Sequence, residues 1–203
     1  MPPMTALPPL ILGSTSRYRR ELLERLHLPF TCVAPEVDET PQPGEAPAAL
    51  ALRLALAKAR AVAALHPVAV VIGSDQVADL HGQPLGKPGS HERAVAQLQQ
   101  MSGQQVMFHT AVAVVCAASG FAEAALAPVT VQFRELSDLE IERYLRLDQP
   151  YDCAGSAKSE SLGITLLSAI HSDDPTALIG LPLIRTSELL RRAGIDPLAG
   201  PAA

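Results

Sequence analysis

Hydroxyl and guanidinium groups are concentrated near the start of the chain, in the run Gly13-Ser14-Thr15-Ser16-Arg17-Tyr18-Arg19-Arg20. A short apolar segment precedes the run and an amphipathic one follows it, so the run marks a turn from a strand into a helix. Free backbone N–H groups and the helix dipole make such a helix start an anion site. Arg19 and Arg20 lie one turn inside, where a guanidinium can bind a phosphate bidentately. An ordinary helix cap followed by a solvated basic turn is the alternative interpretation.

Two acidic segments offer oxygen ligands or a proton acceptor. Asp75, in Ser74-Asp75-Gln76, follows the apolar run Val68 to Ile72, and the carboxyl end of a strand is where catalysis usually takes place. Its carboxylate could hold a metal ion or accept a proton from water, or it could be a turn residue. Asp38 and Glu39 lie in a loop where acidic residues are usually just solvated. A site for a triphosphate and Mg²⁺ needs such ligands, however, so either residue could join Asp75.

Lysines are the remaining candidates for binding an anion. Lys58 is isolated in a helix made almost entirely of alanine and leucine, where it could reach solvent along its own stem or point at a phosphate. Lys87 lies in a stiff Gly-Lys-Pro loop and suits the same task. A later loop, Asp152 to Gly163, is rich in small residues that allow a ligand close to the backbone, and it carries Lys158 and Glu160. A flexible surface loop is the alternative there.

The elements that must position these residues follow from hydrophobic period and from cap and turn residues. Strands and helices alternate early and two long strands follow, so we expect an α/β fold with a mixed central sheet, flanking helices and a cleft. The expected strands are 10–12, 30–33, 68–72, 77–80 paired with the segment after Gly82, 106–116, 123–133 and 164–170; the expected helices begin after Ser14 to Ser16, at 48–65, 91–101, 137–147 (with a Ser137 and Glu140 capping box) and 183–193. Loops are expected at 35–47 and 151–163.

Composition excludes several classes of protein. The chain has 203 residues, 48% of them hydrophobic, which suits a single domain over residues 1–203 or two lobes around a cleft, with a flexible tail at 197–203. A net charge of −5 argues against a broad nucleic-acid-binding face. No apolar run is long enough to span a membrane, and Met1 to Pro9 lacks the basic start of a signal peptide. Three scattered cysteines indicate reduced thiols in a cytoplasmic protein.

Taken together, these segments are far more specific than any one alone. The order S-x-S-x-x-R-R, D-E, a helical lysine, G-S-D-Q, G-K-P, C-A-G-S-x-K-S-E and G-L-P-L resembles the Maf family from Leu10 to Gly194. The resemblance implies an α/β cleft shared with inosine-triphosphate pyrophosphatases. It also implies hydrolysis of a nucleoside triphosphate to monophosphate and pyrophosphate with a divalent metal, Mg²⁺ or Mn²⁺. Asp75 would be the catalytic proton acceptor and, with Glu39, a metal ligand; the phosphate-binding set would be Ser14, Arg19, Arg20, Lys58 and Lys87.

The branch of the family is indicated by two motifs. The branch that acts on dTTP and UTP reads A-D-T and D-K-A-G-A-Y-G, whereas this chain reads S-D-Q and C-A-G-S-A-K-S-E, similar to the 7-methyl-GTP pyrophosphatases. Methylation at guanine N7 makes the base cationic, so Tyr18 could stack on it and Glu160 could accept from its N–H groups, with Gln76 helping to select the base. Tyr18 replaces a frequent Trp, which bears on base recognition, and Ser161 replaces a frequent Gly, which bears on loop flexibility.

Two other functions fit the same residues. A non-catalytic nucleotide sensor would keep the cationic residues but need no general base, and a broad house-cleaning pyrophosphatase would accept many triphosphates. A possible homodimer is expected from the family and from the frequency of such assemblies. We expect neither a nucleic-acid partner nor a membrane.

Overall fold

The computed structural model describes residues 8 to 199. It confirms the α/β fold with a mixed sheet. Along the chain its elements are β1 (Leu10–Leu12), α1 (Arg17–Glu24), β2 (Thr31–Cys32), α2 (Pro47–Leu65), β3 (Val70–Leu80), β4 (Gln83–Leu85), α3 (His91–Met101), β5 (Gln105–Cys116), β6 (Phe121–Phe133), α4 (Asp138–Asp148), β7 (Leu167–His171) and α5 (Leu183–Arg192). Three short 3₁₀ turns complete them: η1 (Ala154–Ser156), η2 (Leu162–Leu166) and η3 (Ala177–Ile179).

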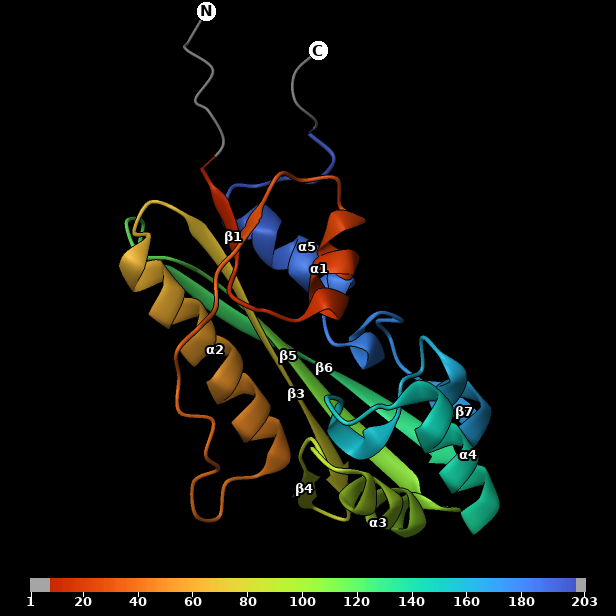
Figure 1. Ribbon diagram of the computed structural model, residues 1–203. Coiled ribbons are helices and arrows are strands. Elements are labelled where there is room, and N and C mark those ends of the chain that lie inside the picture. Colours follow the sequence, from red (N-terminus) through yellow and green to blue (C-terminus); the bar gives the residue numbers. More distant parts are fainter. Residues whose placement is uncertain (1–7, 200–203) are drawn as a thin grey trace, which may run out of the picture.

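Seven strands form one continuous sheet in the order β2-β1-β3-β5-β6-β7, with β4 also paired to β3. β1, β2 and β3 are parallel, and all the other pairings are antiparallel. The three long strands β3, β5 and β6 run the length of the molecule (Figure 1). β2 has two residues and is shorter than the 30–33 run expected, because only Thr31 and Cys32 pair with β1, opposite Ile11 and Leu12.

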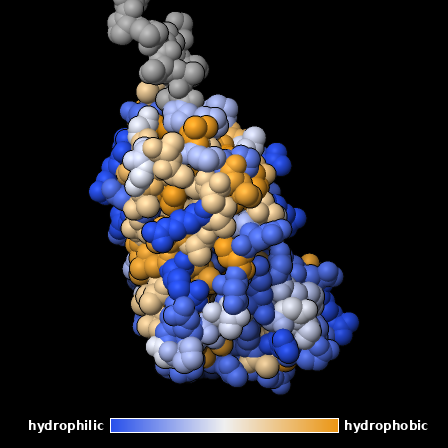
Figure 2. Space-filling view, turned by 90° about the vertical axis from the view of Figure 1, so that its left-hand side faces the viewer, coloured by the Kyte–Doolittle hydropathy of each residue, from blue (hydrophilic) through white to orange (hydrophobic). Residues whose placement is uncertain are grey.

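Helices cover the two faces of the sheet unequally. α2 packs alone on one face, whereas the other face carries α1 with α5 at one end and α3 with α4 at the other (Figure 1). Each group of helices has its own apolar cluster against the strands. Figure 2 views the molecule from the α2 side, where apolar surface is broken up by charged side chains. The half-buried Leu52 and Leu56 of α2 belong to the cluster beneath this face.

β3 corrects the sequence prediction of two short strands separated by a Gly-Ser-Asp turn. It is one strand of eleven residues, because β5 pairs with it without interruption from Val71 to Asp79. On its other edge, β1 pairs only with residues 70–72 and β4 only with residues 78–80. Within residues 8–199, the edge of β3 between Gly73 and Val77 therefore has no neighbouring strand. Asp75 lies in the middle of this strand, and not at its carboxyl end as the sequence suggested.

Gly73 allows α2 to approach this open stretch of β3 closely. A Cβ atom on Gly73 would lie 2.3 Å from the carbonyl oxygen of Ala55 and 2.6 Å from the amide nitrogen of Ala59, so no larger residue fits. The small alanines on this side of α2 complete the contact. As a result, the helix lies directly over the strand backbone, and Lys58 is brought to Asp75.

The remaining boundaries follow the sequence with two exceptions. The strand expected at 164–170 begins only at Leu167, because residues 162–166 form η2, and the loop expected at 151–163 contains η1. The Ser137 and Glu140 capping box of α4 is confirmed. Of the predicted flexible tail, residues 197–199 form a turn and bend, and residues 200–203 lie outside the described part, as do residues 1–7 of the N-terminal segment. Within residues 8–199, no helix is both long and apolar enough to cross a membrane.

Candidate active site

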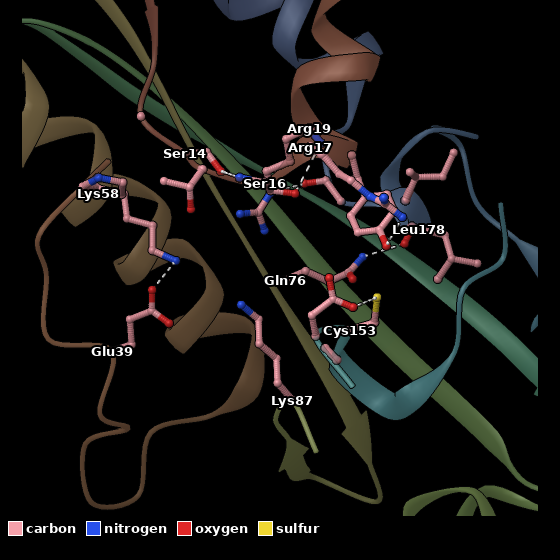
Figure 3. A pocket seen from close by; sticks show the side chains of 18 of the residues that line it. Ser14, Ser16, Arg17, Arg19, Glu39, Lys58, Gln76, Lys87, Cys153 and Leu178 are labelled. Carbon is pink, nitrogen blue, oxygen red and sulfur yellow. Dashed lines mark hydrogen bonds and ion pairs between the residues drawn. The ribbon is translucent and has the colours of Figure 1, made fainter. Parts of the chain in front are cut away.

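A cavity of about 480 Å³ opens where β3 lacks a neighbouring strand. Its walls come from the β1–α1 turn, the loop before α2, β3, the loop after β4, the η1 region and η3 (Figure 3). Both faces of the sheet contribute, because side chains alternate along a strand and both sides are accessible at an open edge. The lining residues are Gly13 to Arg19, Ala34, Pro35, Glu39, Lys58, Gln76, Lys87, Asp152 to Ala154, Ala157, Glu160 and Leu178 to Gly180.

At one end of the cavity, two carboxylates meet a single ammonium group. Lys58 Nζ lies 2.6 Å from Asp75 Oδ1 and 2.7 Å from Glu39 Oε1. Lys58 and Asp75 are buried, while about half of the Glu39 side chain is exposed. Burial alone would raise the pKa of Glu39, but the hydrogen bond and charge of Lys58, aided by Lys87 and Arg19, hold this pKa below its ordinary value. The lowered pKa keeps Glu39 ionised beside this cluster of cations.

The start of α1 forms the next wall of the cavity. Ser16 is the helix cap and accepts from the amide of Arg19 at 3.4 Å, while Ser14 Oγ accepts from the amide of Ser16 at 3.1 Å. The backbone N–H groups of Arg17 and Tyr18 make no hydrogen bond to another described residue. This helix start therefore leaves two backbone donors free, which is what an anion site at a helix N-terminus requires.

Arg19 is fixed in the wall of the cavity by η3. Its Nε donates to the carbonyl oxygen of Gly180 at 2.8 Å. Burial lowers the pKa of Arg19, and the charges of Asp75 and Glu39 oppose this shift. The remaining guanidinium donors are free to bind an anion between these two carboxylates and the helix start.

The two arginines predicted to act together are separated by the helix. Arg20 does not line the cavity; it is largely exposed and pairs with Glu24 one turn on, at 3.0 Å. Successive helical residues point about 100° apart, and the next step along α1 turns Arg20 out of the cavity toward Glu24. Arg17, which the sequence had not singled out, lines the cavity instead. The sequence gave no signal for this, because the direction of Arg17, the first residue of α1, depends on where the helix begins.

Gln76, Cys153 and Leu178 line the opposite end of the cavity (Figure 3). Tyr18, which lies against Lys158, and Glu160, whose charge acts on Cys153, also line the cavity. Cations already lie against the Tyr18 ring: Arg17 Cζ is 4.8 Å from its centroid and Lys158 Nζ is 5.9 Å away. Burial raises the pKa of Glu160, and the nearby carboxylates of Asp148 and Asp152 raise it further. The positive charge of Lys158 acts in the opposite direction and lowers this pKa. The cavity thus combines an aromatic ring that attracts cations with a carboxylate.

The late loop that carries Glu160 is anchored to the end of α4. Lys158 is buried and donates from Nζ to the carbonyl oxygen of Asp148 at 3.0 Å, so it does not point at the phosphate end. Ser161 Oγ donates to Asp148 Oδ1 at 2.6 Å. Ser161, which stands where the 7-methyl-GTP branch often has Gly, thus anchors the loop to the end of α4.

The carboxylates of Glu39 and Asp75 fit a divalent metal ion that takes only one or two of its ligands from the protein. Within the described residues, no group of three or more His, Cys, Asp or Glu side chains is arranged to hold a metal ion. Two carboxylates that converge within reach of one ammonium nitrogen match the way in which Mg²⁺ is bound, by one or two carboxylates with substrate phosphates and water completing the shell.

The arrangement of strand, cavity and charged residues is that of an α/β protein with a charged cleft at an open strand edge, and comparison with known proteins gives the family. The model of the Maf family, described as Maf-like protein, matches residues 9–193, and the chain belongs to this family. It is 71% identical over 187 residues to a 7-methyl-GTP pyrophosphatase of Polaromonas sp. (strain JS666), covering 92% of this chain and 85% of the relative. Proteins of the same name from Albidiferax ferrireducens and Bordetella pertussis are 67% and 61% identical, over 93% and 98% of this chain and 95% and 100% of theirs.

Proposed function

We propose that this protein is a hydrolase of acid anhydrides that cleaves 7-methyl-GTP to 7-methyl-GMP and pyrophosphate. The observation that carries the proposal is the buried Lys58 between Asp75 and Glu39, at the cationic end of a cavity that is also lined by Tyr18 and Glu160. The names of relatives that are 61% to 71% identical over nearly the whole chain support the same activity.

The triphosphate is assigned to the cationic end. Lys58, Lys87 and Arg19, together with the free N–H groups at the start of α1, would neutralise its charge and stabilise the pyrophosphate that leaves. Ser14 supports this by holding the turn through its hydrogen bond to the Ser16 amide. Arg20 keeps only a long-range electrostatic role, because it pairs with Glu24 outside the cavity.

Glu39 and Asp75 are proposed to bind Mg²⁺ or Mn²⁺ together with the substrate. When bound, such an ion offsets phosphate charge and lowers the pKa of nearby water. Lys58 would have to share or release the two carboxylates as the nucleotide enters, and it would then be free to turn toward a phosphate.

Asp75 is the proposed general base. Its Oδ1 is taken by Lys58, and no described residue donates to its Oδ2. This second oxygen can accept a proton from water, or orient the water, as it attacks the α-phosphorus opposite the pyrophosphate. A position in the middle of a strand, paired on one edge by β5, keeps the carboxylate in place.

The base is assigned to the other end of the cavity. A 7-methylguanine ring carries positive charge, which an aromatic face and a carboxylate both favour over a neutral base. Tyr18 would stack on the ring and Glu160 would accept from its N–H groups, with Gln76 beside them. The Arg17 guanidinium must leave the Tyr18 ring for this stacking. The cationic base then takes the place of the guanidinium on the ring.

A substrate panel tests this proposal against the alternatives. 7-methyl-GTP, GTP, dTTP and UTP are each assayed for pyrophosphate and orthophosphate, with Mg²⁺, with Mn²⁺ and with EDTA. We expect pyrophosphate alone, the highest kcat/KM for 7-methyl-GTP, and no turnover in EDTA. Equal turnover of all four nucleotides would favour a broad house-cleaning enzyme, and tight binding without turnover would favour a nucleotide sensor.

The setting of the enzyme is proposed to be the cytoplasm. Cys32, Cys116 and Cys153 are all free thiols, which suits the reducing cytoplasm. A homodimer is the expected assembly. A nucleotide substrate is the sole partner that the site requires, and we assign neither a nucleic-acid nor a membrane partner.

A further inference from the structure

The loop between β2 and α2 is tied to the rest of the chain by two side chains of α2. Within the described residues, the backbone of residues 34–45 makes no hydrogen bond to another segment except through Arg53. The ion pairs of the same stretch are those of Glu39 with Lys58 and of Glu45 with Arg53. Figure 3 shows the loop running past the helix with Glu39 turned toward Lys58. The position of this loop therefore depends on two cations of one helix.

Arg53 binds the loop through three hydrogen bonds. Its Nε donates to Glu45 Oε1 at 2.5 Å and its Nη2 donates to Glu45 Oε2 at 2.7 Å, so the guanidinium and the carboxylate meet as two parallel forks. Nη2 also donates to the carbonyl oxygen of Thr40 at 3.1 Å. Thr40 directly follows Glu39 in the chain, so the guanidinium fixes the backbone beside that carboxylate.

The pair of Arg53 and Glu45 is shielded from solvent and stays charged. The Glu45 side chain is only 8% exposed and the Arg53 side chain 29%. The hydrogen bond from Arg53, supported by the backbone amide of Gln42, lowers the pKa of Glu45 to about 2. The carboxylate is therefore ionised near neutral pH. A lysine ammonium could replace the charge of Arg53 but not its planar fork.

Lys58 is the less permanent of the two anchors. It bonds to Asp75 as well as to Glu39, and these carboxylates are the proposed ligands of the metal ion. In the proposed function, Lys58 shares or releases them as metal and nucleotide enter. Arg53 makes no hydrogen bond to either carboxylate and does not line the cavity. Its bonds to the loop can therefore persist when the site is filled.

We infer that Arg53 is a positioning residue that holds Glu39 in the metal site once Lys58 has turned away. This inference rests on the proposed function and explains how a loop with few other bonds keeps a metal ligand in place. Arg53 acts through the Thr40 carbonyl group and through Glu45, and it touches neither substrate nor metal. Without Arg53, metal binding has to order the loop, and this loss of conformational entropy weakens the affinity.

Binding of Mn²⁺ alone, measured from the electron paramagnetic resonance signal of the free ion, is the test. In Arg53→Met, which has no guanidinium, the Kd of Mn²⁺ should rise about threefold to tenfold. Arg53→Lys keeps the charge but loses the fork, so its Kd should rise by a similar factor. Arg60 is exposed on the same helix, and Arg60→Met is the matched control, which should keep the wild-type Kd.

A double-mutant cycle separates positioning from a general loss of structure. In Glu39→Gln the metal ligand is gone, so adding Arg53→Met should change the Kd of Mn²⁺ by less than about twofold. A purely structural role of Arg53 would weaken Mn²⁺ binding by the same factor with or without Glu39. Glu45→Gln breaks the same anchor from the loop side, and it serves if Arg53→Met does not fold.

Three results would overturn the inference. The first is wild-type Mn²⁺ affinity in Arg53→Met and Glu45→Gln, the second is an effect of Arg53→Met that persists in Glu39→Gln, and the third is a wild type that does not bind Mn²⁺. Failure of the proposed function is separate: it would show as a wild type that binds Mn²⁺ but forms no pyrophosphate from 7-methyl-GTP. The Mn²⁺ affinities then still decide the role of Arg53, because they need no turnover.

Discussion

Among single residues, Asp75 and Lys58 are the most important for the proposed reaction. In Asp75→Asn the shape is kept, but the side chain can no longer accept a proton or match the affinity of a carboxylate for a metal ion. We expect kcat to fall by about 10²–10⁴-fold or more, with circular dichroism and the melting temperature showing an intact fold. The assay is pyrophosphate release with saturating metal. Arg20→Ala is the matched control, because Arg20 is exposed outside the cavity, and near wild-type kcat in Asp75→Asn would remove the residue from its role.

Arg17 and Tyr18 make a second prediction about single residues. Because the Arg17 guanidinium lies over the Tyr18 ring, it competes with a cationic base for the same face. Arg17→Ala should therefore raise the kcat/KM ratio of 7-methyl-GTP to GTP by a few fold, and Tyr18→Leu should lower it. If Arg17→Ala instead lowers kcat/KM for both nucleotides equally, Arg17 binds the phosphates, which the two nucleotides share.

Most single residues of the site could be predicted from the sequence, because the family motifs mark them. Ser14, Tyr18, Arg19, Glu39, Lys58, Gln76, Lys87 and Glu160 all line the cavity, and Asp75 contacts Lys58 beside it. Their roles remain predictions. Arg17 was missed and Arg20 was misplaced, because the direction of each side chain depends on where the first turn of α1 begins. Arg53 and Glu45 were also missed, because a pair of charged residues gains its meaning only from the neighbours that the fold supplies.

The contact of α2 with β3 is the decisive feature at the scale of elements. Gly73→Ala would force a methyl group into the backbone of α2, whose nearest atom would be 2.3 Å away. We expect a loss of about 1–3 kcal/mol of stability from overpacking, and a larger loss of activity as Lys58 moves away from Asp75. Denaturant unfolding and kcat are measured together. Gly86→Ala, at an exposed glycine with nothing near its Cβ and no left-handed φ, controls for loss of a glycine. Wild-type activity in Gly73→Ala would show that the close approach is not needed.

α4 anchors the late loop through Asp148, so the stability of this helix bears on the site. Its capping can be tested by changing the pH. Hydrogen bonds from Ser137 and Arg134 lower the pKa of Glu140 at the start of this helix from 4.5 to about 2. A lowered folded-state pKa means that the ionised group stabilises the fold above pH 4.5, and that this contribution is lost as pH falls toward 2. The stability difference between wild type and Glu140→Gln should therefore shrink over this window. Unfolding curves at several pH values measure it, and a constant difference would contradict the assignment.

Element boundaries could be predicted where cap and turn residues mark them. They could not be predicted where pairing between strands determines them. The bounds of α3 and the capping box of α4 follow from local residues. The single long β3 does not, because Gly73 to Asp75 resembles a turn until β5 pairs with it along its whole length. Pairing between strands distant in sequence thus overrides the local signal, and it also moved Asp75 from the end of a strand to its middle.

At the scale of the whole molecule, the fold leaves one edge of a central strand open. β1 and β4 cover the two ends of β3, and the cavity occupies the stretch between them. Helices on both faces can thus deliver charged groups to one place: α2 supplies Lys58 from one side, and α1 supplies Arg19 from the other. The class of fold was predictable from alternating helices and strands, but this gap was not, because it depends on how far each neighbouring strand extends.

The central claim is attack of water on the α-phosphorus of 7-methyl-GTP, with pyrophosphate as the leaving group. Hydrolysis in ¹⁸O-labelled water, followed by mass spectrometry of both products, tests it most directly. We expect one ¹⁸O atom in 7-methyl-GMP and none in pyrophosphate. Label in pyrophosphate, or release of labelled orthophosphate with 7-methyl-GDP, would place the attack at another phosphorus and contradict the roles given to Asp75, Glu39 and Lys58.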